Sequence, residues 1–125
     1  MDVATNNVLW IAGRLLLGIL FVYGGIHHLF SISVLSQAIA ARGMPAAKAV
    51  LLLGTALQTI AGLALILGVY TYWAAWGLIV FTITASILLV NFWNMEGAAR
   101  GDALRTWWSN SAIVGGLLIT AANSS

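Results

Sequence analysis

The sequence predicts an all-α integral membrane protein that folds as a four-helix bundle, with residues 1–125 in a single membrane domain. Hydrophobic residues make up 62% of the chain and charged residues only 6%, whereas about a quarter of the residues in a soluble domain are charged. Four apolar segments approach the roughly 20 residues that a membrane-spanning helix needs. Aromatic residues gather at the ends of these segments, as they do at the two interfaces of a membrane.

Four spans are expected, at about residues 8–29, 46–69, 72–92 and 107–122. The fourth is short and carries polar residues at 109–111. Residues 31–45, between the first two spans, are long enough for a short interfacial helix. Residues 70–71 predict a tight turn, and residues 94–106 predict a loop that holds most of the remaining charge.

An even number of spans places both termini and the tight turn on one side of the membrane, and the two longer loops on the other. Most of the basic residues lie on the side of the longer loops, namely Arg42, Lys48, Arg100 and Arg105. Cytoplasmic loops of membrane proteins carry an excess of such residues. We therefore expect loops 30–45 and 93–106 in the cytoplasm and both termini outside.

The composition also excludes several classes of function. The basic residues are too few to form the clustered basic face of a nucleic-acid-binding protein. The absence of cysteine excludes disulfides, iron–sulfur clusters and zinc thiolate sites. Asp2, Glu96 and Asp102 are the acidic residues, and all lie outside the expected spans, so a buried catalytic triad or carboxylate pair cannot be assembled. We expect no catalysis by this chain alone.

Arg14 is the first candidate for a functional residue. An arginine near the middle of a membrane helix costs about 2.5–3.5 kcal/mol on insertion scales, so it needs a partner or a route to water. Gln58 lies near the middle of the antiparallel second span, and we expect a hydrogen bond between its amide and the Arg14 guanidinium. The alternative is that Arg14 extends to its own interface, about two turns away, without a function.

The other ends of the spans bring together a second polar group, which consists of His27, His28, Asn91, Asn94, Glu96 and Asn110. Adjacent histidines on a helix point about 100° apart, so they cannot hold one metal ion without further ligands. We expect no metal, no haem and no covalently bound cofactor. The group either satisfies helix ends and contacts lipid headgroups, or contacts a ligand or partner through His28, Asn91 and Asn110.

Small and polar residues at helical spacing mark the faces on which membrane helices pack. Gly18 and Gly25 belong to such a stripe on the first span. On the third span, Gly77, Thr84 and Asn91 recur every seven residues. These residues are expected to face the interior of the bundle.

Several motifs together resemble the DoxX family of small bacterial membrane proteins. They are RLLLGILFVYGGIHHLF at 14–30, GMP at 43–45, QTIAGLALILG at 58–68, NFW at 91–93, and Asn110 followed by GGLL at 115–118. The resemblance implies a four-span fold in the bacterial inner membrane. Some relatives are membrane subunits of quinone-linked oxidoreductases, including those of thiosulfate oxidation, or partners of redox-stress enzymes.

The chain departs from the family pattern at three positions. Family members usually carry Lys at the position of His28, Glu at that of Gln58 and Arg at that of Tyr72. Two charges expected inside the membrane are therefore absent. This difference argues against a proton-coupled or charge-coupled function and favours the docking of a partner.

The leading hypothesis is an accessory subunit that anchors a partner, or completes a quinone-facing or lipid-facing pocket, in a membrane-associated oxidoreductase complex. Arg14, Gln58 and His28 would hydrogen-bond a quinone carbonyl or a partner backbone in an apolar groove. Membrane lipid and another membrane or peripheral protein are the expected partners, and a homo-oligomer is an alternative assembly. A second hypothesis is a self-associating carrier or channel for an anion or small metabolite, and a membrane enzyme ranks third.

Overall fold

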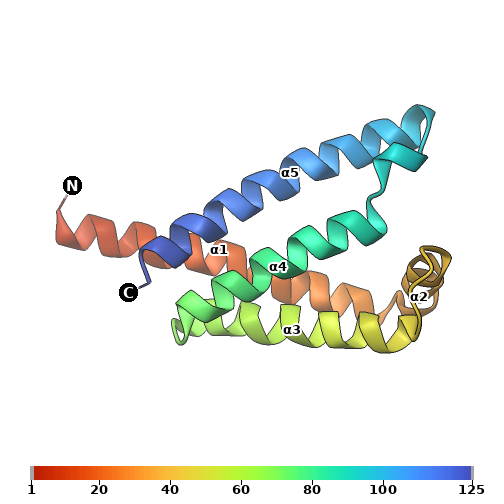
Figure 1. The fold of residues 1–125 in the computed structure, drawn as a ribbon. Helices are drawn as coiled ribbons and strands as arrows, with labels where there is room; N and C mark the ends of the chain where they lie inside the picture. Colours follow the sequence, from red (N-terminus) through yellow and green to blue (C-terminus); the bar gives the residue numbers. More distant parts are fainter. Residues whose placement is uncertain (1, 125) are drawn as a thin grey trace.

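The computed structural model describes residues 2–124, and Met1 and Ser125 of the predicted domain lie outside the described residues. The helices are α1 (Val3–Leu29), α2 (Ile32–Ala41), α3 (Ala47–Leu67), α4 (Thr71–Leu89), the short 3-10 helix η1 (Phe92–Asn94) and α5 (Gly97–Ala122). The predicted all-α fold class is confirmed. The N-terminal end of α1, the α3–α4 turn and the C-terminal end of α5 lie toward one end of the molecule, and α2 and η1 lie toward the other (Figure 1).

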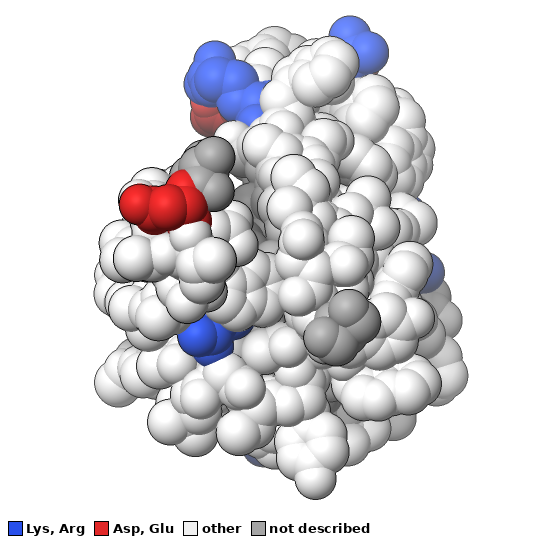
Figure 2. Space-filling view, turned by 90° about the vertical axis from the view of Figure 1, so that its left-hand side faces the viewer, with Lys and Arg blue, Asp and Glu red and all other residues white. Residues whose placement is uncertain are grey.

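Within residues 2–124, three segments are long and apolar enough to span a membrane: Val3–Leu29, Ala47–Leu67 and Thr71–Asn94. α5 has 26 residues, which correspond to a length of about 39 Å, but its first half carries charged side chains. The predicted span 107–122 covers the rest of the helix, which carries no charged residue. Seen from the end that holds the termini, most of the surface is uncharged, and the charged side chains form a few separate patches (Figure 2).

One of the predicted connections has a different structure from the one expected. Residues 31–45 do contain a short helix, α2, as predicted. The loop predicted for residues 93–106 is wrong over most of its length, because α5 begins at Gly97. This segment is rich in alanine, which favours a helix, and Arg105 pairs with Asp102 one turn earlier. Charge alone marked it as a loop, but charged residues are also compatible with an exposed helix.

α1 begins at Val3, before the predicted start of the first span at residue 8, because Asp2 caps the helix. The Thr5 backbone N–H donates to Asp2 Oδ1 at 2.7 Å. Such a side-chain acceptor satisfies one of the free N–H groups in the first turn of a helix. The helix therefore also includes residues 3–7, which precede the apolar segment predicted as the first span.

The Asp2 cap is expected to be pH-dependent. Hydrogen bonds from the side chain and backbone of Thr5 lower the pKa of the Asp2 carboxyl. The stabilisation of the first turn should be complete above about pH 3.9, the pKa of an unfolded aspartate, and should be lost as the pH falls through the lower folded-state pKa. NMR titration of the Thr5 amide in detergent measures this. The transition should be absent from Asp2→Asn, and an unchanged transition there would assign it to another group.

α1 and α3 form the closest helix pair in the bundle. Gly18 of α1 faces Gly62 of α3 so tightly that a Cβ atom at Gly18 would lie 2.6 Å from the Gly62 carbonyl oxygen. Small residues permit such close backbone approach between membrane helices. The predicted packing role of Gly18 and Gly25 is consistent with this geometry, because both are buried.

The other half of the bundle consists of α4 and α5, which pack on each other, with α4 also packed on α3. Leu65, Leu78 and Leu117, one from each of α3, α4 and α5, are fully buried in the shared core. α1 and α5 have little mutual contact. Leu17 lies against Gly116 where they meet, and elsewhere the side between α1 and α5 is open.

The predicted inward face of the third span is wrong at Thr84, whereas Gly77 is half-buried and lies against Leu57 of α3. The buried residues of α4 include Leu78, Thr82 and Ser86, whereas Thr84 is exposed. Apolar residues surround α4 almost evenly, so its sequence carries little information about which face is inside. The contacts with α3 and α5 determine its orientation instead.

Candidate functional site

Two cavities lie along the open side between α1 and α5, one on each side of the Leu17–Gly116 contact. The first, here called the terminal cleft, has a volume of about 750 Å³ and is lined by residues 6–17 of α1 and 116–123 of α5 and its C-terminal cap. The second, here called the polar cavity, has a volume of about 260 Å³ and is lined by four helices. They differ in chemistry, because the terminal cleft contains Arg14 whereas the polar cavity is lined by no Lys, Arg, Asp or Glu.

All four long helices contribute polar side chains to the polar cavity. These side chains are His28 of α1, Gln58 of α3, Thr82 and Ser86 of α4, and Asn110 of α5. Asn110 Nδ2 donates to Ser86 Oγ at 2.8 Å, and the Ser86 hydroxyl donates to the Thr82 carbonyl at 2.7 Å. The α4–α5 side of the cavity is therefore fixed by a chain of hydrogen bonds.

Three buried polar atoms at the polar cavity have no hydrogen-bond partner among residues 2–124. They are His28 Nδ1, Gln58 Oε1 and Thr82 Oγ1, and the His28 and Gln58 side chains lie close enough to interact with each other. Gln58 and Thr82 are each only 5% exposed. A buried polar group without a partner costs about 1–3 kcal/mol. The cavity therefore presents neutral hydrogen-bonding groups whose pairing would be completed by a molecule bound there.

Apolar side chains form the rest of the cavity wall. Phe21, Phe81 and Ile113 are among them, and the two phenylalanine rings meet edge to face with centroids 6.4 Å apart. A smaller apolar cavity of about 180 Å³ under α2 shares His28 and Phe81 with the polar cavity. Apolar walls with a few converging polar groups are typical of small-molecule sites.

Arg14 lies outside the polar cavity, and its predicted hydrogen bond with Gln58 is wrong. Its Nη1 donates to the Leu65 carbonyl at 2.9 Å, and the guanidinium lies 5.5 Å from the Trp10 ring centroid. Gln58 is seven residues from Leu65, or about 10 Å along the helix axis. The Gly18–Gly62 contact sets this register, which places Gln58 opposite Gly24 instead.

Arg14 therefore has a structural role at the end of α3. The last carbonyl groups of a helix have no partner within the helix, and a cation near them interacts favourably with the helix dipole. Gly68, which ends α3 with φ 75°, leaves the space that the guanidinium occupies. Neither of the two roles predicted for Arg14 includes this contact. One was a hydrogen bond with a side chain and the other an extension to the membrane interface, whereas the observed partner is a backbone carbonyl.

The structure brings together three of the five sequence-predicted site residues, namely His28, Gln58 and Asn110. Asn91 precedes η1 and is not part of the cavity lining. Sequence reasoning missed Thr82 and Ser86. Their spacing of four residues, which places two hydroxyls on one face of an apolar helix, was the available signal.

Residues 2–124 contain no group of three or more His, Cys, Asp or Glu side chains that could hold a metal ion. The polar cavity is lined by one histidine and neutral amide and hydroxyl groups. This donor set suits hydrogen bonding to an uncharged molecule better than coordination of a cation. The absence of a metal or bound cofactor stays a prediction.

Comparison with known proteins gives two matches. The DoxX family model matches residues 9–91, which contain all of the polar-cavity residues except those of α5. The inner membrane protein YphA of Escherichia coli (strain K12) is 24% identical over 118 residues, which cover 94% of this chain and 84% of the relative. No solved structure matches the chain significantly.

Proposed function

This chain belongs to the DoxX family and is a multi-pass inner membrane protein like YphA, and we propose that it is an accessory subunit whose polar cavity binds the head group of a quinone. The partner in this proposal is a membrane-associated oxidoreductase that supplies the electrons. The chain itself supplies hydrogen bonds and an apolar enclosure. The unpaired His28, Gln58 and Thr82 atoms are the observation on which the proposal depends.

The chemistry of a quinone matches these groups in both redox states. The oxidised ring carries two carbonyl acceptors, which the Thr82 hydroxyl and the Gln58 amide N–H can serve. The reduced ring carries hydroxyl groups, which can donate a hydrogen bond to the Gln58 carbonyl. Both forms are neutral, as are the Gln58 and Thr82 side chains that would hold them. The open side between α1 and α5 gives a lipid-soluble molecule, or the partner, a route to the cavity.

The sequence hypothesis is changed in one respect. Arg14 contacts Leu65 at the other side of the Leu17–Gly116 contact, so it is not assigned to the quinone. Gln58, His28 and Thr82 take this role, and Asn110 positions Ser86 beside them. The orientation with both termini outside the cytoplasm remains a prediction.

Replacing Thr82 with valine is expected to weaken the binding of a short-chain ubiquinone to the detergent-solubilised protein by about 2–10-fold. This range corresponds to the loss of one hydrogen bond of about 0.5–1.5 kcal/mol. Binding is measured by titration calorimetry. Thr84→Val is the matched control, because Thr84 is exposed on the same helix and lines the neighbouring apolar cavity rather than the polar cavity, and it should bind as the unmodified protein does.

Equal affinities of Thr82→Val and Thr84→Val, or no saturable binding by the unmodified protein, would contradict the quinone site. The partner is tested separately by purification in a mild detergent, followed by mass spectrometry of the associated proteins. An oxidoreductase subunit is expected in near-equal amount. Recovery of this chain alone would contradict the role of an accessory subunit.

A further inference from the structure

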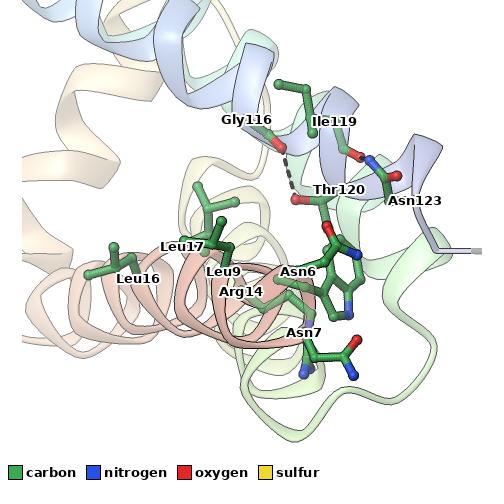
Figure 3. A pocket seen from close by; sticks show the side chains of 12 residues that line it. Asn6, Asn7, Leu9, Arg14, Leu16, Leu17, Gly116, Ile119, Thr120 and Asn123 are labelled. Atoms are coloured by element: carbon green, nitrogen blue, oxygen red, sulfur yellow. Dashed lines mark hydrogen bonds between the residues drawn. The ribbon is translucent and has the colours of Figure 1, made fainter. Parts of the chain in front are cut away.

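The terminal cleft has a volume of about 750 Å³, and it is separate from the proposed quinone site. Arg14 lies on α1 at one edge of it, with Asn6 and Asn7 about two turns earlier, and Thr120 and Asn123 lie at the α5 edge (Figure 3). We propose that this cleft binds a phosphate oxyanion, carried by the head group of an anionic phospholipid. The proposal does not depend on the function proposed for the polar cavity.

The charge of Arg14 is only partly compensated by the protein. A guanidinium has five N–H donors, and one hydrogen bond, to the Leu65 carbonyl, is formed. The Nε atom is buried without an acceptor among residues 2–124. The ion pair formed within these residues joins Arg105 and Asp102, so no described carboxylate neutralises Arg14. The end of α3 offsets only about half a charge.

An oxyanion is the ligand that completes this arrangement. Arginine binds phosphate through several N–H groups in a planar fork, and such charge-assisted hydrogen bonds are stronger than neutral ones. The Thr120 hydroxyl and an Asn123 amide N–H already donate to the Gly116 and Ile119 carbonyls, both at 2.8 Å. We therefore assign the additional donors to the amides of Asn6 and Asn7, which line the same cleft.

The apolar part of the cleft indicates that the phosphate belongs to a lipid. Leu16 and Ile119 line it and are 73% and 65% exposed. These side chains extend from Arg14 toward the Leu17–Gly116 contact, along the open side that faces the surroundings of the bundle. An acyl chain can cover them while the phosphate lies at Arg14. A free phosphate ion would leave this part of the cleft empty.

The test uses the full chain, stripped of lipid in detergent and titrated with phosphatidylglycerol, phosphatidylcholine or inorganic phosphate. Native mass spectrometry counts bound lipid, and equilibrium dialysis measures bound phosphate. We expect one phosphatidylglycerol per chain and at least about tenfold weaker binding by Arg14→Gln. A preference for phosphatidylglycerol over phosphatidylcholine is also expected, because only the former has a net negative charge to offset that of Arg14.

Arg42→Gln is the matched control. Arg42 also donates to a helix carbonyl, that of Ile87 at 3.4 Å, and also lies near a tryptophan ring, 5.6 Å from the centroid of Trp93. It does not line the terminal cleft, so this variant should bind the lipid normally. Because Arg14→Gln also removes the contact at the end of α3, the Asn6→Ala/Asn7→Ala double variant tests the cleft with that contact intact. Weaker lipid binding is expected there too.

The outcomes separate the two sources of phosphate. Binding of phosphatidylglycerol but not of inorganic phosphate supports a lipid site. Binding of inorganic phosphate that depends on Arg14, without lipid binding, would overturn the lipid assignment. Unchanged phosphatidylglycerol binding by folded Arg14→Gln, or an equal loss in Arg42→Gln, would overturn the site itself.

Discussion

Replacing Gly18 with alanine is expected to destabilise the protein by about 1–3 kcal/mol, the usual cost of overpacking a well-packed core. The new Cβ atom would lie 2.6 Å from the Gly62 carbonyl oxygen and 2.6 Å from Ile66 Cγ1. The Ile66 side chain can rotate, but the Gly62 carbonyl belongs to the backbone of α3. α1 and α3 must therefore move apart. Thermal unfolding of the purified protein in detergent, followed by circular dichroism, measures the effect.

Gly13→Ala is the matched control for this prediction. Gly13 is on the same helix, and a Cβ atom there would meet nothing within 4 Å. Alanine is a better helix former than glycine, so this variant should be as stable as the unmodified protein or slightly more stable. Equal stability of the two variants would show that α1 and α3 are not packed as closely as the Gly18–Gly62 contact requires.

The same helix pair determines the position of both cavities. It places Gln58 opposite Gly24, beside the polar cavity, and Arg14 opposite the end of α3. A change in the spacing of α1 and α3 at Gly18 would therefore shift both cavities. Gly18→Ala is therefore also expected to weaken quinone and lipid binding together, whereas Thr82→Val and Arg14→Gln should each affect one.

The fold could be predicted from the sequence because lipid imposes simple requirements on a chain. A spanning helix must be apolar over about 20 residues and must satisfy its backbone polar groups internally. These requirements gave the positions of the first three long helices. They gave no information on the first half of α5, which extends the fourth helix beyond its apolar part. This half is stabilised as a helix by its alanine residues and a local ion pair, which hydropathy does not indicate.

The candidate site was predicted only in part, for a related reason. His28, Gln58 and Asn110 stood out as polar residues in apolar surroundings, and all three line one cavity. Thr82 was missed because a hydroxyl on an apolar helix is a weak signal. The partner of Arg14 was missed because the Leu65 carbonyl is a backbone group, which residue types do not indicate, and because the register of α1 on α3 depends on a contact between two glycines.

The aromatic cluster at the other end of the bundle carries the second large effect. Trp107 of α5 lies edge to face against Phe92 and Trp93, with ring centroids 5.7 and 6.1 Å away. Its Nε1–H also donates to the carbonyl of Val90, where α4 ends. This one side chain therefore joins α5 to the end of α4 and to η1.

Replacing Trp107 with alanine is expected to destabilise the protein by about 3 kcal/mol, near the lower end of the usual range for a large aromatic residue because Trp107 is only partly buried. Trp107→Phe keeps a ring and loses the hydrogen bond, so it should cost about 1 kcal/mol. The adjacent Trp108 is 76% exposed, and Trp108→Ala should change the free energy of unfolding by about 0.5 kcal/mol or less. Thermal unfolding in detergent gives all three values.

A second measurement connects this cluster to function. Asn110 is one turn along α5 from Trp107, and its hydrogen bond to Ser86 fixes the α4–α5 side of the polar cavity. If Trp107 holds α5 in place, Trp107→Ala should weaken quinone binding at temperatures where the protein is still folded, and Trp108→Ala should not. Equal loss of stability in both alanine variants would mean that aromatic contact with the detergent, rather than the Phe92–Trp93–Trp107 cluster, stabilises this end of the bundle.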